Sequence, residues 1–391
     1  MNAPPGWPMD TYIGLMSGTS LDGVDGVLMR REPHRDTGWR TLAHAHRPFP
    51  QPLRQAMLAL NTPGDNELHR AAEAAQALVV LYAVVVNALC EAAHVLPSEV
   101  RAIGAHGQTV RHRPEWGYTL QLNHPALLAE MTGIDVVADF RARDVAAGGQ
   151  GAPLVPAFHD AVFARPGATV VVLNIGGMAN LSILRPGHTP LGFDCGPGNA
   201  LLDMWCEAHT GQPFDADGAW GAAGQVHEAW LADALSEPYF ALPPPKSTGR
   251  DLFNAHWLQS WLARHGVSGH ALADEAHALA DSGTARDVQA TLCELTARSA
   301  AQAVASHAPD AAELVVCGGG ALNGDLMHRL AAQLPGVRVA RSDAHGLDAM
   351  QVEAAAFAWL AWAHVQRQPG NLPAVTGARG PRVLGALYPA A

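Results

Sequence analysis

The segment Tyr12-Ile-Gly-Leu-Met-Ser-Gly-Thr-Ser-Leu-Asp-Gly-Val-Asp25 decides the predicted fold. Its apolar start, Tyr12–Met16, has the length of a short strand, and Val24–Met29 forms a second strand after the turn Gly18–Gly23. Glycines in such a turn let the backbone approach an anion and point its N–H groups at it. The segment therefore predicts a β-hairpin whose turn can bind phosphate.

The first 150 residues extend this hairpin in the order βββαβαβ. The stretch Ala77–Cys90 is the most apolar of the chain, but Asn87 and Glu91 interrupt it, so a buried helix is favoured over a membrane span. Periodicity and caps predict strands at Thr41–Arg47, Arg101–Ala105 and Ile134–Ala138, and helices at Asn66–His94 and Pro125–Thr132.

The rest of the chain repeats the same order of elements. The predicted strands are Thr169–Asn174, Asn180–Leu184, Thr189–Phe193, Leu314–Cys317 and Val337–Ala340. The predicted helices begin at Pro197 and continue at Val226–Leu235, Asn254–His265, Arg286–Ser306, Leu322–Leu334 and Asp348–Val365. Two βββαβαβ lobes around a central cleft predict an α/β protein of the ribonuclease H-like class, which includes acetate and sugar kinases, Hsp70 and actin.

Segments rich in proline and glycine mark the predicted boundaries. Gly148–Pro153 and Arg165–Gly167 separate an N-terminal lobe of residues 1–150 from a C-terminal lobe of residues 151–391. Pro243–Pro245 opens a helical insertion in the second lobe, and the tail after about residue 370 is expected to return to the first lobe.

Composition excludes several classes of protein. Of 391 residues, 48% are hydrophobic and 16% charged, so the chain can bury a large core. The net charge of -11 and the lack of a Lys/Arg run argue against a nucleic-acid partner. The five cysteines form no CxxC pair and Met1–Asp10 lacks the features of a signal peptide, so we expect a cytoplasmic protein without membrane contact.

Three glycine-rich turns, each after a strand, are the candidate nucleotide-binding segments. None matches GxxxxGK[ST], so no P-loop is predicted. Any one of them is equally well explained as a hairpin turn or a helix cap, but three at corresponding places in two similar units favour phosphate binding. The candidate residues are Gly18, Thr19, Ser20, Leu21, Asp22, Gly23, Val24, Asp25, Gly176, Gly177, Gly318, Gly319, Gly320 and Asn323.

Three acidic residues are candidates for chemistry. Asp22, beside the first turn, can hold Mg²⁺ through water, or can be the side chain of an Asx-turn. Asp194 lies at the end of a strand, and Pro197 at the first helical position would make Gly196 the N-cap and leave Asp194 available for catalysis. Glu353 is the only acid in an apolar helix, and a solvated helix face explains it equally well.

The motifs together resemble one family, the anhydro-N-acetylmuramic acid kinases. The matching segments span nearly the whole chain: Ile13-Gly-Leu-Met-Ser-Gly-Thr-Ser-Leu-Asp-Gly-Val-Asp25, Gly104-Ala-His-Gly-Gln-Thr109, Ala138-Asp-Phe-Arg-Ala-Arg-Asp-Val-Ala-Ala-Gly-Gly-Gln-Gly-Ala-Pro153, Asn174-Ile-Gly-Gly-Met-Ala-Asn180, Phe193-Asp-Cys-Gly-Pro-Gly-Asn199, Pro245-Lys-Ser-Thr-Gly-Arg250 and Cys317-Gly-Gly-Gly-Ala-Leu-Asn323. Two positions depart from the family pattern: Cys195 stands in place of threonine and Asp251 in place of glutamate.

The resemblance implies a reaction of bacterial cell-wall recycling. In it, ATP phosphorylates O6 of 1,6-anhydro-N-acetylmuramic acid while water opens the anhydro ring, giving N-acetylmuramic acid 6-phosphate and ADP. It implies Mg²⁺ as a cofactor and Asp194 as the base that activates the water. It also makes Glu353, His106, Gln108 and Arg141 candidate contacts of the sugar.

Two other classes of protein stay open at this point. One is a nucleotide-gated binding protein of the Hsp70 or actin type, and the other is a glycoside hydrolase with two carboxylates that works without ATP. A homodimer is also left open.

Overall fold

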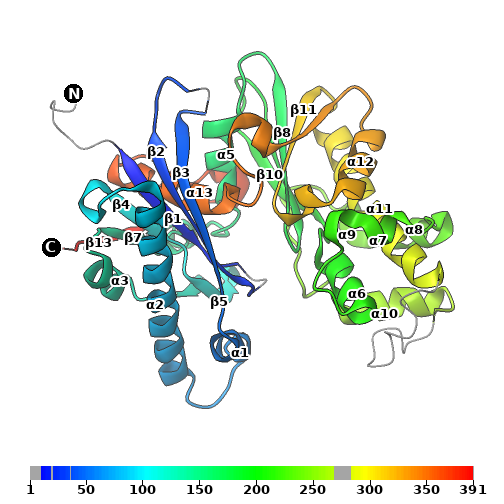
Figure 1. Cartoon of the computed structure of the whole chain (residues 1–391). Coiled ribbons are helices and arrows are strands. Elements are labelled where there is room, and N and C mark those ends of the chain that lie inside the picture. The colour runs from blue at the N-terminus through cyan, green and yellow to red at the C-terminus, as the bar shows by residue number, and fades with distance from the viewer. Residues whose placement is uncertain (1–9, 19–20, 36, 268–282, 391) are drawn as a thin grey trace. The chain divides into compact units, whose positions relative to one another are not determined.

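The computed structural model describes residues 10–18, 21–35, 37–267 and 283–390. The chain forms two compact units (Figure 1). Unit 1 comprises Met1–Val162 and Gln351–Ala391, and unit 2 comprises Phe163–Met350. Each unit has its own sheet and its own core. The cleft expected between the lobes stays a prediction.

Unit 1 is built on a six-stranded sheet in the order β13-β7-β4-β1-β2-β3. The first three strands along the chain form an antiparallel meander, whereas β4 and β7 run parallel to β1. The strands are β1 (Thr11–Met16), β2 (Gly23–Arg31), β3 (Trp39–Pro48), β4 (Ala102–Ala105), β7 (Val136–Ala138) and β13 (Ala386–Tyr388).

Two helices cover opposite faces of the unit 1 sheet. Side chains alternate along a strand, so Ile13 and Leu15 pack with α2 (Glu67–Ala93) in one core while Gly14 faces the other side. There α13 (Val352–Val365) lies directly on β1, and a Cβ on Gly14 would overlap the carbonyl oxygen of Ala354.

Gly104 plays the same part on β4. A Cβ there would overlap the carbonyl oxygen of Phe357, so only glycine lets the α13 backbone come this close.

The C-terminal tail of the chain is held on the same unit by Asp144, whose buried carboxylate accepts hydrogen bonds from Asn371 Nδ2 (2.6 Å) and Thr376 Oγ1 (2.8 Å). The helix and the tail therefore complete unit 1.

The observed units differ from the predicted lobes in two segments, 151–162 and 351–370, which belong to unit 1. The apolar helix α13 was expected in the second lobe because of its place in the sequence. It packs on the sheet of unit 1 because Gly14 and Gly104 have no side chains that would overlap its backbone.

The helix α2 is, among the described residues, the one helix long and apolar enough to cross a membrane by length and composition alone, with a mean hydropathy of 1.8 in its most apolar window. That window is 56% buried, and α2 packs on β2, β3 and α3 (Pro125–Thr132). These contacts are those of a core helix, as the interrupted apolar run predicted.

Unit 2 repeats the strand order of unit 1. Its sheet has the order β10-β9-β8-β11-β12, with three antiparallel strands followed by two parallel ones. This is the order of β3-β2-β1-β4-β7, and it confirms the doubled ribonuclease H-like architecture. The strands are β8 (Thr169–Ile175), β9 (Ala179–Leu184), β10 (Leu191–Gly196), β11 (Ala311–Cys317) and β12 (Arg338–Arg341).

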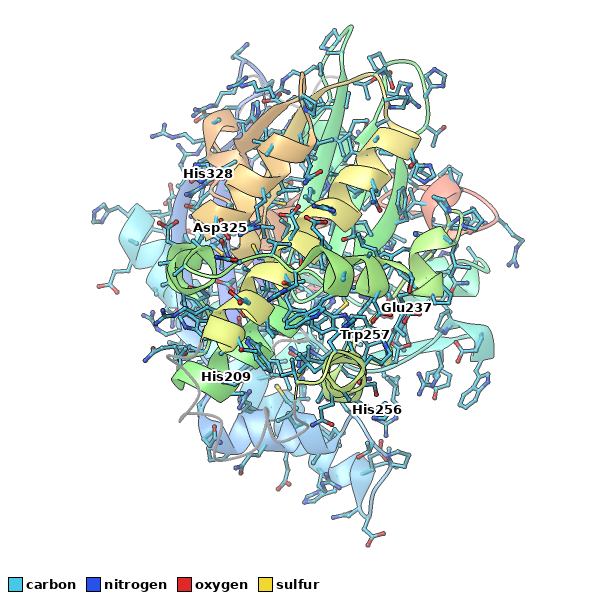
Figure 2. All side chains as sticks on the ribbon, turned by 90° about the vertical axis from the view of Figure 1, so that its right-hand side faces the viewer. His209, Glu237, His256, Trp257, Asp325 and His328 are labelled. Atoms are coloured by element: carbon cyan, nitrogen blue, oxygen red, sulfur yellow. The ribbon has the colours of Figure 1, made fainter. Side chains whose placement is uncertain are left out.

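The helices between β10 and β11 form the insertion, and the last of them, α11, packs on β9 and β10. In the insertion, the indole of Trp257 donates a hydrogen bond to Glu237 (2.9 Å; Figure 2), and aromatic rings such as Trp230 and Trp261 pack edge to face. The helices are α6 (Ala200–Thr210), α7 (Ala219–Ala222), α8 (Glu228–Leu235), α9 (Pro238–Ala241), α10 (Ala255–Arg264), α11 (Gly283–His307) and α12 (Gly324–Gln333).

Several short elements were not predicted. The separate hairpin of β5 (Gln108–Arg113) and β6 (Tyr118–Leu122) carries Gln108 at its start. The other additions are the strand β13, the helices α1 (Gln51–Ala59), α4 (Ala142–Ala146), α5 (Val155–Phe163), α7, α9 and α14 (Pro373–Thr376) and the 3₁₀ turns Pro97–Glu99, Pro114–Trp116, Ala216–Gly218, Gly319–Leu322 and Ser342–His345.

Candidate active site

Two glycine turns of unit 2 meet at one edge of its sheet. The first joins β8 to β9 at Gly176–Met178, and the second follows β11 at Gly318. Since β8 and β11 are neighbours and parallel, with Asn174 opposite Cys317, both turns lie at the same end. The backbone N–H of Asn199, from the segment that precedes α6, donates to the carbonyl of Gly176 in the first turn (2.9 Å).

Some of these glycines are required by packing. Gly318 has φ of +80°, and a Cβ there would lie 2.5 Å from Asn174 Oδ1. A Cβ on Gly320 would overlap the side chain of Ile175. These two glycines allow the turns to fit against each other, so they shape the site from beneath.

The other glycines face open space. A Cβ on Gly177 would have nothing within 4 Å, one on Gly176 only Met178 O at 3.8 Å, and one on Gly319 only Asn199 Nδ2 at 3.5 Å. An approaching ligand can therefore reach the backbone here, which is what phosphate oxygens need.

Asn323 has a structural task besides its predicted one. The 3₁₀ turn Gly319–Leu322 lies between Gly318 and α12, and Asn323 is the N-cap of α12, with Oδ1 accepting from Leu326 N at 2.9 Å. The prediction that the third turn leads directly into a helix at Leu322 is therefore wrong, because the chain makes one tighter turn first. The predicted nucleotide contact of Asn323 stays a prediction.

Asp194 lies in β10, at a register shift between Asp194 and Gly196 where β10 pairs with β9. The prediction that Pro197 begins the next helix with Gly196 as its N-cap is wrong. The strand continues through Gly196, Gly198 turns the chain with φ of +53°, and the helix α6 begins at Ala200. Asp194 is therefore a strand residue that caps no helix.

Three hydrogen bonds from one segment of the insertion hold Asp194. Tyr239 donates its hydroxyl to Asp194 O (2.7 Å), Lys246 O accepts from Asp194 N (3.1 Å), and Thr248 N donates to Asp194 Oδ2 (3.0 Å). Within the same segment, the ammonium of Lys246 donates hydrogen bonds to the carbonyls of Tyr239 (3.2 Å) and Phe240 (3.1 Å). We call residues 239–248 the clamp segment.

Burial raises the pKa of Asp194 to about 6, and the hydrogen bond from Thr248 N opposes that rise. An ordinary aspartate has a pKa near 3.9 and is a weak base. A carboxylate with a pKa about two units higher takes a proton more readily and is still largely ionised at neutral pH. A raised pKa of this kind suits the role of general base, which stays a prediction for Asp194.

The predicted sugar contacts come together in unit 1. His106 follows β4, Arg141 precedes α4, and the carboxylate of Glu353 in the first turn of α13 acts electrostatically on Arg141. Arg141 donates from Nε (3.2 Å) and Nη2 (3.0 Å) to His106 Nε2, so His106 carries its proton on Nδ1 and donates it to Ser17 O at 3.2 Å. Burial, followed by the charge of Arg141, lowers the pKa of His106 to about 3, so the ring is neutral.

Gln108 connects this group to the first glycine turn. Its Nε2 donates to Gly18 O at 3.1 Å, and its Oε1 is buried without a hydrogen bond from the described residues. A buried acceptor of this kind suits a hydroxyl or amide donor of a ligand.

The first hairpin supplies one exposed carboxylate, Asp22, whose Oδ1 accepts from Gly23 N at 2.9 Å. Asp25 instead contacts His44 (3.2 Å) and His46 (3.1 Å). Leu21 and Val24 bury their side chains in the core, which leaves only their backbone for a nucleotide. The predicted residues Thr19 and Ser20 lie outside the described residues.

The acidic residues of the candidate site suit an Mg²⁺ ion that phosphates and water also hold, but not a metal ion held by protein side chains alone. Within the described ranges, no group of three His, Cys, Asp or Glu side chains could hold a metal ion. Magnesium at phosphate sites is typically held by one or two carboxylates together with phosphates and water. One exposed aspartate such as Asp22 therefore matches what nucleotide-bound Mg²⁺ needs.

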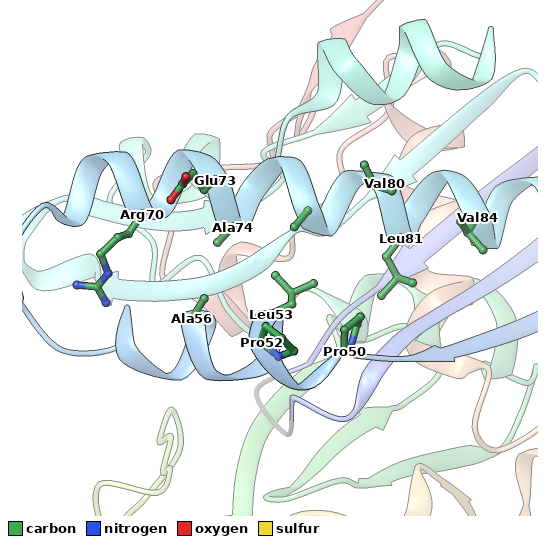
Figure 3. Close-up of a pocket in the computed structure, with 11 residues that line it drawn as sticks. Pro50, Pro52, Leu53, Ala56, Arg70, Glu73, Ala74, Val80, Leu81 and Val84 are labelled. Atoms are coloured by element: carbon green, nitrogen blue, oxygen red, sulfur yellow. The ribbon is translucent and has the colours of Figure 1, made fainter.

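A separate hollow of about 470 Å³ lies between α1 and α2 (Figure 3). Its lining is mostly apolar, with Pro52, Leu53 and Val80 among the residues that face it. It contains no predicted site residue, and its only charged lining residues are Arg70 and Glu73. It is therefore separate from the chemistry described above.

A sequence model of the family described as anhydro-N-acetylmuramic acid kinase matches residues 10–390. The chain belongs to the anhydro-N-acetylmuramic acid kinase family. A relative named anhydro-N-acetylmuramic acid kinase from Variovorax paradoxus is 58% identical over 97% of this chain and 99% of that protein. One of the same name from Bordetella petrii is 58% identical over 98% of this chain and 97% of that protein.

One of the solved structures that are similar to this chain is much more distant in sequence. The activator of the 2-hydroxyisocaproyl-CoA dehydratase from Clostridium difficile, with bound ADPNP, is 10% identical, with a TM-score of 0.45, over 91% of this chain and 96% of that chain.

The clamp segment contains the residues that sequence reasoning missed. In the sequence, Lys246–Arg250 was recognisable only as part of a segment that resembles the family. The structure instead gives Lys246, Thr248 and Tyr239 contacts to Asp194 or to each other. The short run Lys-Ser-Thr-Gly-Arg after three prolines was the one signal in the sequence for this segment.

We predict that Gly319→Val weakens ATP binding by roughly tenfold or more, because a branched side chain fills the space that phosphate needs, whereas the free energy of unfolding changes little. Gly318→Val is the matched control. It should lower the free energy of unfolding by about 2 kcal/mol or more, because it has positive φ and a crowded Cβ. Calorimetry with ATP and denaturant titration check both, and unchanged affinity in a folded Gly319→Val would make this an ordinary turn.

We also predict an acid limb near pH 6 in kcat/KM for the sugar. Asp194 acts as a base only when ionised, so activity should rise as the pH rises through its pKa of about 6. Burial also raises the pKa of Asp203 to about 7, so Asp203→Asn is the control and should keep the limb. A limb that disappears in Asp203→Asn would assign it to that residue.

Proposed function

We infer that the protein is an ATP-dependent kinase of 1,6-anhydro-N-acetylmuramic acid. The relatives that share 53–58% of its residues over at least 97% of this chain are named for this activity. The single structural observation that supports it best is Asp194, a clamped carboxylate with the raised pKa of a base. The substrate is a small sugar and the phosphoryl donor is ATP.

The chemistry we propose couples ring opening to phosphoryl transfer. Asp194 takes a proton from a water molecule as the water oxygen bonds to C1 of the sugar. The C1–O6 bond breaks, and O6 with its electron pair attacks the γ-phosphorus of ATP. The bond from the γ-phosphorus to the bridging oxygen breaks, giving ADP and N-acetylmuramic acid 6-phosphate. A positioned base of this kind typically contributes about 10²–10⁴-fold.

The glycine turns are proposed to bind the phosphates of ATP. A Cβ on Gly177 would meet nothing within 4 Å and one on Gly319 only Asn199 Nδ2 at 3.5 Å, so a phosphate can approach the backbone here. Backbone N–H donors at such a turn stabilise the charge that spreads over a transferring phosphoryl group. Asp22 is the residue we assign to Mg²⁺, through water, and the ion would neutralise part of the phosphate charge. Gly18–Asp25 is assigned to the same nucleotide.

The unit 1 cluster is proposed to bind the sugar. Arg141 brings a positive charge, Glu353 a carboxylate, and Gln108 Oε1 an unused acceptor, which together match the carboxylate, hydroxyl and amide groups of the substrate. His106 is neutral and fully engaged by Arg141 and Ser17, so we assign it to orienting Arg141.

The departure at Cys195 does not alter the proposed site. Its thiol is buried, 1% exposed, and donates to Ala179 O at 3.4 Å. A threonine hydroxyl could donate to the same carbonyl, so the cysteine replaces a core contact and not a ligand contact.

Three further expectations from the sequence stay predictions. They are the cytoplasmic setting, the absence of nucleic-acid and membrane partners, and a homodimer.

One assay separates the proposed kinase from its two rivals. Purified protein is incubated with 1,6-anhydro-N-acetylmuramic acid, with and without Mg²⁺-ATP, and the products are analysed by mass spectrometry. We expect a ring-opened sugar 6-phosphate only with ATP. Ring opening without ATP would support a hydrolase, and ATP binding with no sugar product would support a nucleotide-gated binding protein.

A further inference from the structure

We propose that the hydroxyl of Thr248 is the second protein contact of the attacking water, beside Asp194. This inference rests on the proposed function and adds a catalytic residue to it. It is carried by the geometry of the clamp segment, in which one hydroxyl next to the base has no assigned task.

The hydroxyl of Thr248 is a buried polar group in need of a partner. Its Oγ1 is shielded from solvent and forms no hydrogen bond with the described residues. The backbone N of the same residue donates to Asp194 Oδ2 at 3.0 Å, so the hydroxyl lies close to the carboxylate. A buried hydroxyl left unsatisfied costs free energy, and such exceptions in native structures call for a ligand or an ordered water.

The other polar groups around Asp194 are already engaged. Tyr239 donates its hydroxyl to Asp194 O, Lys246 donates its ammonium to the carbonyls of Tyr239 and Phe240, and the Cys195 thiol donates to Ala179 O. Thr248 Oγ1 is, as far as the structure describes this group, its one buried hydroxyl without a hydrogen-bond partner.

One oxygen of the Asp194 carboxylate also lacks a hydrogen-bond donor among the described residues. Oδ2 accepts from Thr248 N, and none of the described residues donates to Oδ1. A water molecule has two hydrogens to place and needs a lone pair free for C1. A water between Oδ1 and Thr248 Oγ1 can donate one hydrogen to each oxygen and keep a lone pair for C1.

In the reaction this contact orients the water and carries no proton. The O–H bond toward Asp194 Oδ1 breaks, the water oxygen bonds to C1, and C1–O6 breaks as O6 attacks the γ-phosphorus. The second hydrogen stays on the new C1 hydroxyl, held by Thr248 Oγ1 until the product leaves. Orientation of this kind is worth a large factor, because a misplacement of about 1 Å can cost roughly 10²-fold.

The test uses Thr248→Val, which keeps the shape of the side chain and the backbone N–H to Asp194 but removes the hydroxyl. We expect kcat to fall by roughly tenfold or more, with KM for the sugar and the affinity for ATP within about twofold of the parent. The acid limb should stay where the parent has it. Thr248→Ser, which restores the hydroxyl, should recover most of the lost rate.

A second readout separates a contact to water from a merely structural role. In mixtures of water and methanol, the parent should favour water, because two acceptors hold its two hydrogens, whereas methanol has only one. Thr248→Val removes one acceptor, so the ratio of methyl glycoside to free sugar phosphate should rise several-fold. A structural defect would lower the rate and leave this ratio unchanged.

The outcomes are distinguishable. A folded Thr248→Val with kcat within twofold of the parent, or with an unchanged product ratio, would overturn the role of Thr248 and leave the proposed kinase intact. A Thr248→Ser variant as slow as Thr248→Val would also count against the hydroxyl. A parent enzyme that forms no sugar phosphate would overturn the proposed function itself, together with this inference.

Discussion

The hydrogen bonds between Asp194 and the clamp segment are the contacts on which the proposed chemistry depends. They hold the backbone N–H, the backbone oxygen and one carboxylate oxygen of the same residue. An exposed aspartate would rotate freely and titrate near pH 4, too acidic for an effective base at neutral pH. Here the insertion buries the carboxylate enough to raise its pKa, and the bond from Thr248 N keeps it oriented.

This arrangement explains why the helical insertion lies between β10 and β11. The strand β10 brings Asp194 to its register shift, and the insertion returns to cover it 45–54 residues later in the chain. The ammonium of Lys246 donates hydrogen bonds within the insertion, to the carbonyls of Tyr239 and Phe240, which precede Pro243–Pro245. Lys246 therefore stabilises the conformation of the clamp segment.

The sequence predicted the strands well because each is a short apolar run between turns. The two matched strand orders, β3-β2-β1-β4-β7 and β10-β9-β8-β11-β12, follow from that reading. The placement of α13 could not be predicted, because the helix is apolar on every side and fits any core. Only the structure shows that Gly14 and Gly104 make room for its backbone.

The candidate site could be derived from the sequence in part, and one of the arguments for it was wrong. Asp194 was selected for its place at a strand end, for its match to the base of the family and because Pro197 was expected to start a helix, yet the helix starts at Ala200. The contacts of Tyr239 and Thr248 join residues far apart in the sequence, so no local pattern could reveal them. The glycine turns were recognisable, but which glycine packs and which faces a ligand depends on neighbours such as Asn174 and Ile175.

The most direct test of the central claim is kcat for Asp194→Asn, with the affinities for sugar and ATP measured separately. The amide keeps the size of the side chain and can still accept from Thr248 N, so both ligands should bind as in the parent. Turnover should fall by roughly 10²-fold or more, with ring opening and phosphorylation lost together. A variant that turns over within a few-fold of the parent would contradict the assignment of Asp194 as the base.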